Sequence, residues 1–304
     1  MNHLYYHKPR QTILQSKIEQ LPDDHHSKPR CLQQLSQLFH TMGNIAERKY
    51  LLLCALELCR KEGNDYWIAL MLLDLSDANR TLGLVEEGIQ QAKEASEIME
   101  RVGGTPHRAL CLDTLGRLLL QNKQLDAAQD AASGAINLWE TGQEFDICQS
   151  HRLLGQIQTS KGERKKAIHH FEIALGIASR FEWHHQMFWI HDSMARLFYG
   201  EDKLEDAQAH ITQAKSHVVD DKYRLGRAME VQAWIWYRQN RLEAAISELL
   251  GAKEIYEKLG AATDLGRVKN TLQFLERETE SRATSIQSDS SGELLEMLLC
   301  PYTY

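Results

Sequence analysis

Histidine, arginine, aspartate and tryptophan are the residue types of this chain that could do chemistry. There are fourteen histidines, and His184, His185 and His191 lie close together in sequence. His184 and His191 stand two helical turns apart, so their rings could share one face of a helix. No cysteine or carboxylate stands at a spacing that would complete a metal site beside them. We therefore expect no metal site, and we interpret these residues as partly buried, hydrogen-bonded histidines.

Motifs of the common enzyme classes are missing from the sequence. It contains no GxxxxGK[ST] phosphate loop, no HExxH zinc motif and no GxSxG nucleophile turn. The six cysteines show neither CxxC nor paired spacing, which is typical of reduced thiols in a cytoplasmic protein. We expect no cofactor and no catalytic residue. An enzyme with an unrecognised site stays open as an alternative, and it would need titratable groups that converge in a closed pocket.

An alanine that returns at a nearly constant period predicts the elements that position the charged and aromatic residues. The steps between six such alanines are 40, 40, 39, 40 and 38 residues, which indicates one repeated supersecondary unit. A small or polar residue stands nineteen positions before each alanine, and another small residue stands seven before it, except at Arg48. Small residues let two helix backbones approach closely, so each unit is predicted to be a helical hairpin. The alanines are Ala55, Ala95, Ala135, Ala174, Ala214 and Ala252, and the earlier positions are Ser36, Ser76, Gly116, Gly155, Ala195 and Ala233.

The sequence therefore predicts an all-α fold, a right-handed α-solenoid of about six helical hairpins with a C-terminal capping helix. Residues 1–30 are expected to form a lead-in with one short helix, whose apolar stripe holds Ile13, Leu14, Ile18 and Leu21, and a linker. Residues 31–278 are expected to form the solenoid, and residues 279–304 a Ser-rich disordered tail that ends in a short apolar segment. The hairpins are expected at about 31–62, 64–102, 105–142, 144–182, 184–221 and 223–260, and the capping helix near 263–278, with Leu265, Val268, Leu272 and Leu275 on its apolar face.

The positional pattern resembles the tetratricopeptide repeat. The best copies are LGQIQTSKGERKKAIHHFEIALGIA at Leu154–Ala178 and LGRLLLQNKQLDAAQDAASGAI at Leu115–Ile136. The unit is about six residues longer than the ordinary repeat, which is similar to the extended repeats of kinesin light chains. With the LPDDH lead-in at Leu21–His25, the chain is also similar to the sensor regions of fungal NB-ARC-type signalling ATPases. The repeat resemblance covers about residues 31–278 and implies a surface for interactions rather than a catalytic pocket.

The inner face of the first helices is the surface that could carry function. The repeat register places on it the residues three before and one after each small position, and those one turn further along. Its mixed charges and C-terminal aromatic residues suit an extended or helical peptide with acidic and apolar side chains. In this interpretation arginines pair with acidic groups and tryptophans anchor apolar ones. The predicted peptide-binding groove consists of Asp113, Arg117, Arg152, Gln156, Trp189, Asp192, Arg196, Tyr199, Glu230, Trp234 and Tyr237.

The same residues also have a purely structural interpretation. Asp113 and Arg117, like Asp192 and Arg196, are i,i+4 pairs, and such pairs are commonly solvated partners on a helix surface. Trp236 stands on a core-facing position, whereas Trp189 and Trp234 are expected on the exposed face. His151 and His191 occupy the position that holds leucine in the first three repeats, which indicates burial; those leucines are Leu32, Leu72 and Leu112.

The sequence thus predicts a non-enzymatic cytoplasmic scaffold that binds a protein or peptide partner in a concave groove. The net charge of −7 argues against nucleic acid as the main partner, and a helical-repeat RNA-binding array would need a basic inner face. No apolar run is long enough to cross a membrane, so we expect no membrane association.

Two further hypotheses stay open. The leading alternative is that the chain is the detached or truncated ligand-sensing half of an NB-ARC-type signalling ATPase, with its nucleotide-binding part encoded elsewhere. The second concerns the segment Leu294–Leu299, whose leucines share one helical face and could dock in the groove of the same chain. A motif that arises by chance is the other interpretation of that segment.

Overall fold

The computed structural model describes residues 2–22, 25–41, 44–140, 142–259 and 261–284. Every regular element within these ranges is an α-helix, and the described residues contain fourteen of them. They form two compact units, divided between Gln143 and Glu144. The predicted all-α fold is confirmed.

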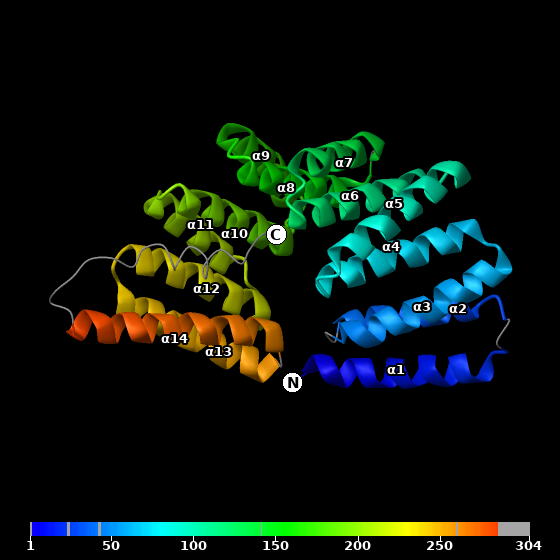
Figure 1. The fold of residues 1–304 in the computed structure, drawn as a ribbon, viewed down its shortest axis with the longest axis horizontal. Helices are drawn as coiled ribbons and strands as arrows, with labels where there is room; N and C mark the ends of the chain where they lie inside the picture. The colour runs from blue at the N-terminus through cyan, green and yellow to red at the C-terminus, as the bar shows by residue number, and fades with distance from the viewer. Residues whose placement is uncertain (1, 23–24, 42–43, 141, 260, 285–304) are drawn as a thin grey trace. The chain divides into compact units, whose positions relative to one another are not determined.

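The first unit is a series of helical hairpins preceded by a single helix (Figure 1). Within this unit α3 packs on α4, α5 packs on α6, and α1 packs on α2. The elements are α1 (Asn2–Gln20), the pair α2 (Lys28–Thr41) and α3 (Ile45–Glu62), the pair α4 (Asp65–Thr81) and α5 (Val85–Val102), and the pair α6 (Thr105–Gln121) and α7 (Leu125–Leu138).

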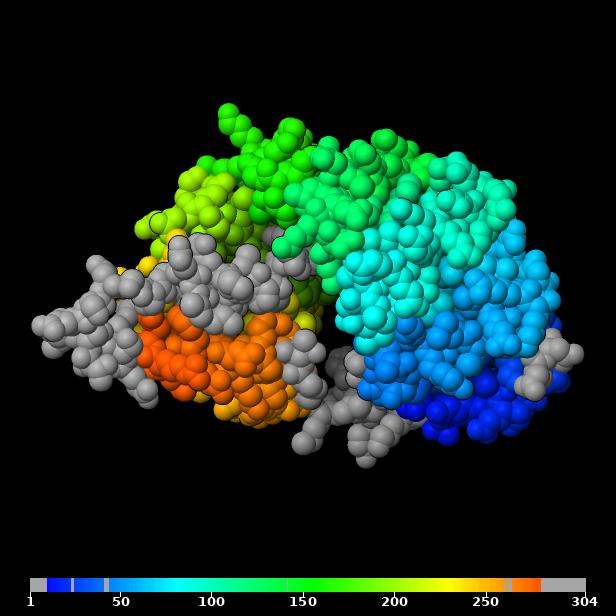
Figure 2. Space-filling model, in the orientation of Figure 1, coloured from blue at the N-terminus to red at the C-terminus, as the bar shows by residue number. Residues whose placement is uncertain are grey.

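The second unit repeats the arrangement and ends in a single helix that packs on the last hairpin. Its elements are the pair α8 (Glu144–Ser160) and α9 (Arg164–Arg180), the pair α10 (His184–Gly200) and α11 (Leu204–Ser216), the pair α12 (Lys222–Arg238) and α13 (Leu242–Leu259), and α14 (Ala262–Thr284). In the space-filling view, the orange to orange-red surface belongs to α13 and α14, which pack on each other (Figure 2). All six predicted hairpins and the capping helix are therefore present.

The turn inside each of the five hairpins from α4–α5 to α12–α13 carries one residue in the left-handed conformation. Its φ is +76° at Gly83, +58° at Lys123, +73° at Gly162, +60° at Asp202 and +58° at Asn240. These residues follow one another at the same period as the alanines, because each reverses the chain between two helices of nearly constant length. A left-handed residue ends an α-helix by satisfying its last carbonyl groups.

The seams between helices are built on the predicted small residues. All six repeat alanines have no exposed surface, and Ser36 and Ser76 have none either. At Gly155 the approach is very close, since a Cβ atom there would lie 2.5 Å from Cε1 of the fully buried Phe171 on α9. The small residues therefore set how near the two helices of a hairpin can come.

Three boundaries or faces differ from the sequence prediction. Ile13 is 67% exposed, so the apolar stripe of α1 rests on Leu14 and Ile18. Helix α2 begins at Lys28, inside the predicted linker, because a proline at position 29 is well tolerated in the first turn of a helix. Helix α14 continues six residues past its predicted end. The predicted tail beyond Thr284, including Leu294–Leu299, lies outside the described residues.

The apolar face of α14 is confirmed. Val268, Leu272 and Leu275 are buried against α13 residues that include Leu249 and Tyr256. Among the described helices none has a stretch long and apolar enough to cross a membrane.

The contact between Gly155 and Phe171 generates a prediction about stability. Gly155→Ala should lower the free energy of unfolding by about 1–3 kcal/mol, because the new methyl group must displace the Phe171 ring. Alanine otherwise favours a helix over glycine by about 1 kcal/mol. Gly176→Ala on α9 is the matched control, since nothing lies within 4 Å of its Cβ position. Urea denaturation of the two variants should therefore give changes of opposite sign, and two stabilised proteins would contradict this account of the seam.

Candidate functional site

The predicted groove residues are divided between the two units. Asp113 and Arg117 lie on α6 in the first unit, whereas the other nine lie on α8, α10 and α12 of the second. We therefore describe two inner faces, each within its own unit.

A buried carboxylate organises the inner face of the second unit. The Asp192 side chain is 4% exposed and lies on α10. Arg196 donates from Nε to Oδ2 at 2.9 Å and from Nη2 to Oδ1 at 3.3 Å. Nη2 of Arg227 on α12 lies 4.0 Å from Oδ2. One carboxylate thus fixes the Arg196 guanidinium group by two hydrogen bonds and attracts that of Arg227 from the neighbouring helix.

Each of these guanidinium groups also lies over an indole ring. Cζ of Arg196 is 5.1 Å from the ring centroid of Trp234, and Cζ of Arg227 is 5.2 Å from that of Trp189. Both contacts join α10 to α12: in one the arginine is on α10 and the indole on α12, and in the other the arginine is on α12 and the indole on α10. We call Trp189, Asp192, Arg196, Arg227 and Trp234 the arginine–indole surface.

The expectation that Trp234 is exposed is wrong. Its side chain is 6% exposed and belongs to the core cluster of the second unit. Its ring centroid lies 6.3 Å from that of Tyr199, and Arg196 covers it. Trp236, expected in the core, is only partly buried and has Arg241 over its ring at 4.8 Å. The reason is that α12 packs on α10, so a large ring one position after Ala233 lies between the helices.

Trp189 remains partly exposed and is oriented by a hydrogen bond. Its Nε1 donates to Nε2 of His185 at 3.2 Å. Burial lowers the pKa of His185, and the positive charges of Arg224 and Arg152 lower it further, while Asp221 acts in the opposite direction. His185 is therefore kept neutral, which is the form that can accept this hydrogen bond.

Glu230 joins the last hairpin to the capping helix. It is 2% exposed, and Oη of Tyr256 donates to its Oε1 at 2.5 Å. Arg267 on α14 donates to both of its carboxylate oxygens at 2.9 Å. Tyr237 also contacts α14, through a 3.5 Å hydrogen bond from Oη to Glu278. These contacts give both residues a role in holding the cap.

Gln156 and Arg152 complete the predicted set in this unit. Gln156 is buried on α8 and donates from Nε2 to Oγ of Ser193 on α10 at 3.1 Å. Arg152 lies near enough to His185 to affect its pKa. The structure thus brings Arg152, Trp189, Asp192, Arg196 and Trp234 together, with Tyr199 beside them.

Sequence reasoning missed Arg227, although a signal was present. Arg227 stands six residues before the small position Ala233, as Trp189 stands six before Ala195. Positions six before, three before and one after a small residue lie on one helical face. Extending the register by one turn towards the N-terminus of each first helix would have included it.

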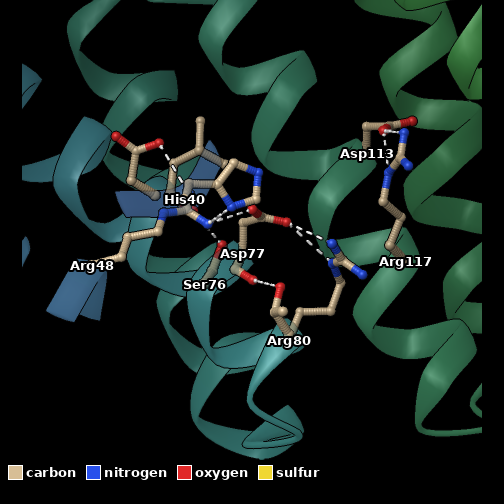
Figure 3. Close-up of polar contacts among 10 residues, drawn as sticks. His40, Arg48, Ser76, Asp77, Arg80, Asp113 and Arg117 are labelled. Carbon is tan, nitrogen blue, oxygen red and sulfur yellow. Dashed lines mark hydrogen bonds and ion pairs between the residues drawn. The ribbon is translucent and has the colours of Figure 1, made fainter. Parts of the chain in front are cut away.

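The first unit has its own polar network, centred on a buried arginine (Figure 3). Arg48 on α3 is 4% exposed and stands at one of the positions that are otherwise small. It donates from Nη1 to Oδ2 of Asp77 at 2.9 Å and lies 3.1 Å from Nδ1 of His40. Arg80 donates to Oδ1 of Asp77 from Nε and Nη2. Burial alone would raise the pKa of Asp77, but Arg80 and Arg48 outweigh it and hold that pKa far below its usual value.

Asp113 is buried in its pair with Arg117, whose side chain is 26% exposed. Asp113 is 7% exposed, and its Oδ2 accepts from Nε of Arg117 at 2.9 Å and from Nη2 at 2.7 Å (Figure 3). The solvated-surface interpretation is therefore wrong for this pair, as it is for Asp192 and Arg196. Among the described residues, no group of three or more histidine, cysteine or acidic side chains could hold a metal ion.

Known structures share this architecture at low sequence identity. RapI in its apo form aligns with a TM-score of 0.69 and 13% identity over 86% of this chain and 94% of that one. A Rap protein in complex with competence and sporulation factor aligns with a TM-score of 0.66 and 13% identity over 89% and 80%. A kinesin-light-chain-type protein of Podosopora anserina with nearly identical TPR-like repeats gives 0.51 and 17% over 64% and 96%. No protein-family model matches the chain, and no curated protein matches its sequence.

The Arg48 network generates a prediction with a pH dependence. Asp77→Asn should lower the free energy of unfolding at neutral pH by about 1–3 kcal/mol, because it takes a carboxylate from a buried arginine. The folded-state pKa of Asp77 lies below its ordinary value of 3.8, so its stabilisation is present above that value and is lost as the pH falls through the folded pKa. The difference between wild type and variant should therefore shrink below about pH 4.

Urea denaturation followed by circular dichroism at several pH values measures this difference. Glu57→Gln is the control, since its partner Lys61 lies on the same helix and both side chains are exposed. The control should not change stability measurably. A difference for Asp77→Asn that stays constant down to strongly acidic pH would contradict the assignment.

Proposed function

We propose that this chain, which has the fold of the tetratricopeptide-repeat proteins, is a non-enzymatic scaffold that binds an acidic, partly apolar peptide segment of a protein partner. The binding site is the arginine–indole surface of the second unit. The observation that carries the proposal is the pair of arginines stacked on indoles and held by Asp192.

The electrostatics of this surface favour an anionic ligand. Four arginines, Arg152, Arg196, Arg224 and Arg227, lie around it together with Asp192 and Asp221. The surface therefore carries a cluster of guanidinium groups, although the whole chain has a net charge of −7. A guanidinium group fixed in a plane can accept a carboxylate with little loss of side-chain entropy.

The aromatic part of the surface favours apolar contacts beside the charge. Trp189 is partly exposed on α10, and so is Tyr199, ten residues later on the same helix. Tryptophan, tyrosine and arginine are the residue types that dominate binding energy at protein interfaces. An apolar side chain next to an acidic one would thus find contacts for both.

The structural similarities support a protein-interaction role. One Rap structure that aligns with this chain is a complex with competence and sporulation factor. Repeat arrays of this kind expose extended surfaces rather than closed pockets. The alternative of a detached sensor of an NB-ARC-type ATPase uses the same surface and stays a prediction, as do cytoplasmic location and the docking of Leu294–Leu299 in this groove.

Panning a phage-displayed random peptide library on the immobilised full chain tests the proposal. Enriched peptides should contain acidic residues beside aromatic or aliphatic ones, and their affinity should fall as salt concentration rises. The Trp189→Ala/Arg227→Gln variant should bind the selected peptides at least about tenfold more weakly in fluorescence anisotropy. Trp234 is left in place, since removing this buried ring would cost about 3–5 kcal/mol of stability.

The matched control replaces the same residue types in the first unit. Trp67→Ala/Arg101→Gln removes a partly buried indole and an exposed arginine from α4 and α5. The control should bind the selected peptides like wild type. Equal affinity of all three proteins, or enrichment of basic peptides, would rule out the arginine–indole surface as the binding site.

A further inference from the structure

Five aromatic rings form a continuous chain of ring contacts, two stacked and two tilted, along the seam between α10 and α11 and just beyond the end of α11. The ring centroids of Phe198 and His210 lie 5.2 Å apart, those of His210 and His191 5.3 Å, those of His191 and His217 5.7 Å, and those of His217 and His184 5.5 Å. Four of the five rings are imidazoles. We call these four the histidine ladder.

Two hydrogen bonds link the ladder in pairs. Nδ1 of His191 lies 3.1 Å from Nδ1 of His210, and Nδ1 of His184 lies 3.2 Å from Nδ1 of His217. Such a bond needs a proton on one of the two nitrogens and a lone pair on the other. A pair with two imidazolium rings would place two N–H groups and two positive charges against each other, so it cannot keep this geometry.

The preceding hairpin contains the same device one period earlier. His151 on α8 and His170 on α9 stand forty residues before His191 and His210, and their Nδ1 atoms are also 3.1 Å apart. In the first three repeats leucine occupies the position of His151 and His191. This position of the repeat is therefore apolar in the first unit, whereas two hairpins of the second unit carry paired imidazoles there.

The surroundings of His191, His210 and His217 favour the neutral form of each of these three rings. Burial, and then His210 and His217, lower the pKa of His191 to about 4. Burial also lowers the pKa of His210 and of His217, and Asp206 acts on His210 in the opposite direction. Asp206 on α11 acts on His210 of the ladder. Arg164 on α9 lies over Phe198 and pairs with Glu201 at the end of α10. Arg152 on α8, and Asp221 and Arg224 at the start of α12, act on His185.

The direction of the pH effect follows from these shifts. A histidine whose folded-state pKa lies below 6.5 binds fewer protons in the folded state than in the unfolded one. Its stabilising contribution is complete above the unfolded value and is lost as the pH falls towards the folded value. The pH range over which His191 loses its stabilising contribution thus runs from about 6.5 down to about 4.

Helix α10 connects the ladder to the arginine–indole surface. His191 and Phe198 contact His210 on α11, and His184 contacts His217 just after that helix. Trp189, Asp192 and Arg196 lie on another face of α10. His185 acts directly, since its protonation removes the acceptor for the indole Nε1 of Trp189. A displacement of α10 from α11 would therefore displace the residues that orient the two arginines.

We propose that the histidine ladder is a proton switch that loosens the α10–α11 hairpin on acidification and releases the peptide from the arginine–indole surface. The proposal rests on the proposed function for its binding part. Its structural part, the opening of the hairpin, can be measured without a ligand.

Hydrogen–deuterium exchange of the full chain at about pH 7.5 and about pH 5 measures the opening, with labelling times scaled for the intrinsic pH dependence of amide exchange. In the wild type, amides of α10 and α11 should lose protection at the lower pH, whereas those of α4 and α5 should keep it. In parallel, the affinity for a fluorescein-labelled acidic peptide from the library should fall about tenfold or more.

The His191→Leu/His210→Gln variant should keep its protection at the lower pH and lose less than about threefold in affinity. Leucine is the residue that other repeats carry at this site, so the packing of the seam is preserved. His217→Gln, which removes one ring near the surface, should shift the opening to lower pH by a smaller amount. His26→Gln in the first unit, an exposed histidine, should behave like wild type.

The outcomes separate the two proposals. Wild-type α10 and α11 that stay protected at about pH 5, or a double variant that opens as the wild type does, would overturn the switch. Opening without any peptide binding at neutral pH would overturn the proposed function and leave the ladder as an acid-sensitive seam. Peptide release without opening would assign the pH effect to His185 and overturn the role of the ladder.

Discussion

The close approach of two helix backbones at small residues is the constraint on which the rest of the structure depends. At Gly155 the Phe171 ring occupies the space of a missing Cβ, and at Ala174 no surface is left for solvent. Burial of apolar surface drives the packing, but the small residues decide its distance. Since they return at a nearly constant period, every hairpin presents the same helical faces to its neighbours.

That distance also determines the environment of the inner face. Because α10 and α12 pack on each other within the second unit, side chains three before and one after the small position lie partly between helices. A polar group placed there is removed from water and requires a partner. Asp192 and Glu230 each form an ion pair with an arginine of a following helix, and the Trp234 ring lies under Arg196. The charged pairs therefore position helices as well as offering charge to a ligand.

The architecture could be predicted from the sequence because its determinants are local and periodic. Ala55 and its equivalents, with the turns between them, define where each helix begins and ends. The depth of a side chain could not be predicted in the same way, since helical periodicity gives a direction around a helix and not the distance to the next one. Trp234 was assigned to the correct face and the wrong environment for this reason. Arg48 and Arg227 were missed as contacts because their partners lie on other helices.

Each histidine pair in a seam replaces buried apolar surface with a hydrogen bond between two polar rings. Leucine at the position of His191 would bury apolar surface without any need for a hydrogen bond. A lone imidazole there would lose its hydrogen bonds to water, but a second imidazole from the facing helix restores one of them. The compensation holds only while at least one ring of the pair is neutral, so stability near the pair depends on proton concentration. Among the described residues the pairs lie in the second unit, which also carries the arginine–indole surface. The helix that depends on proton concentration for its packing is thus the helix that orients the stacked arginines.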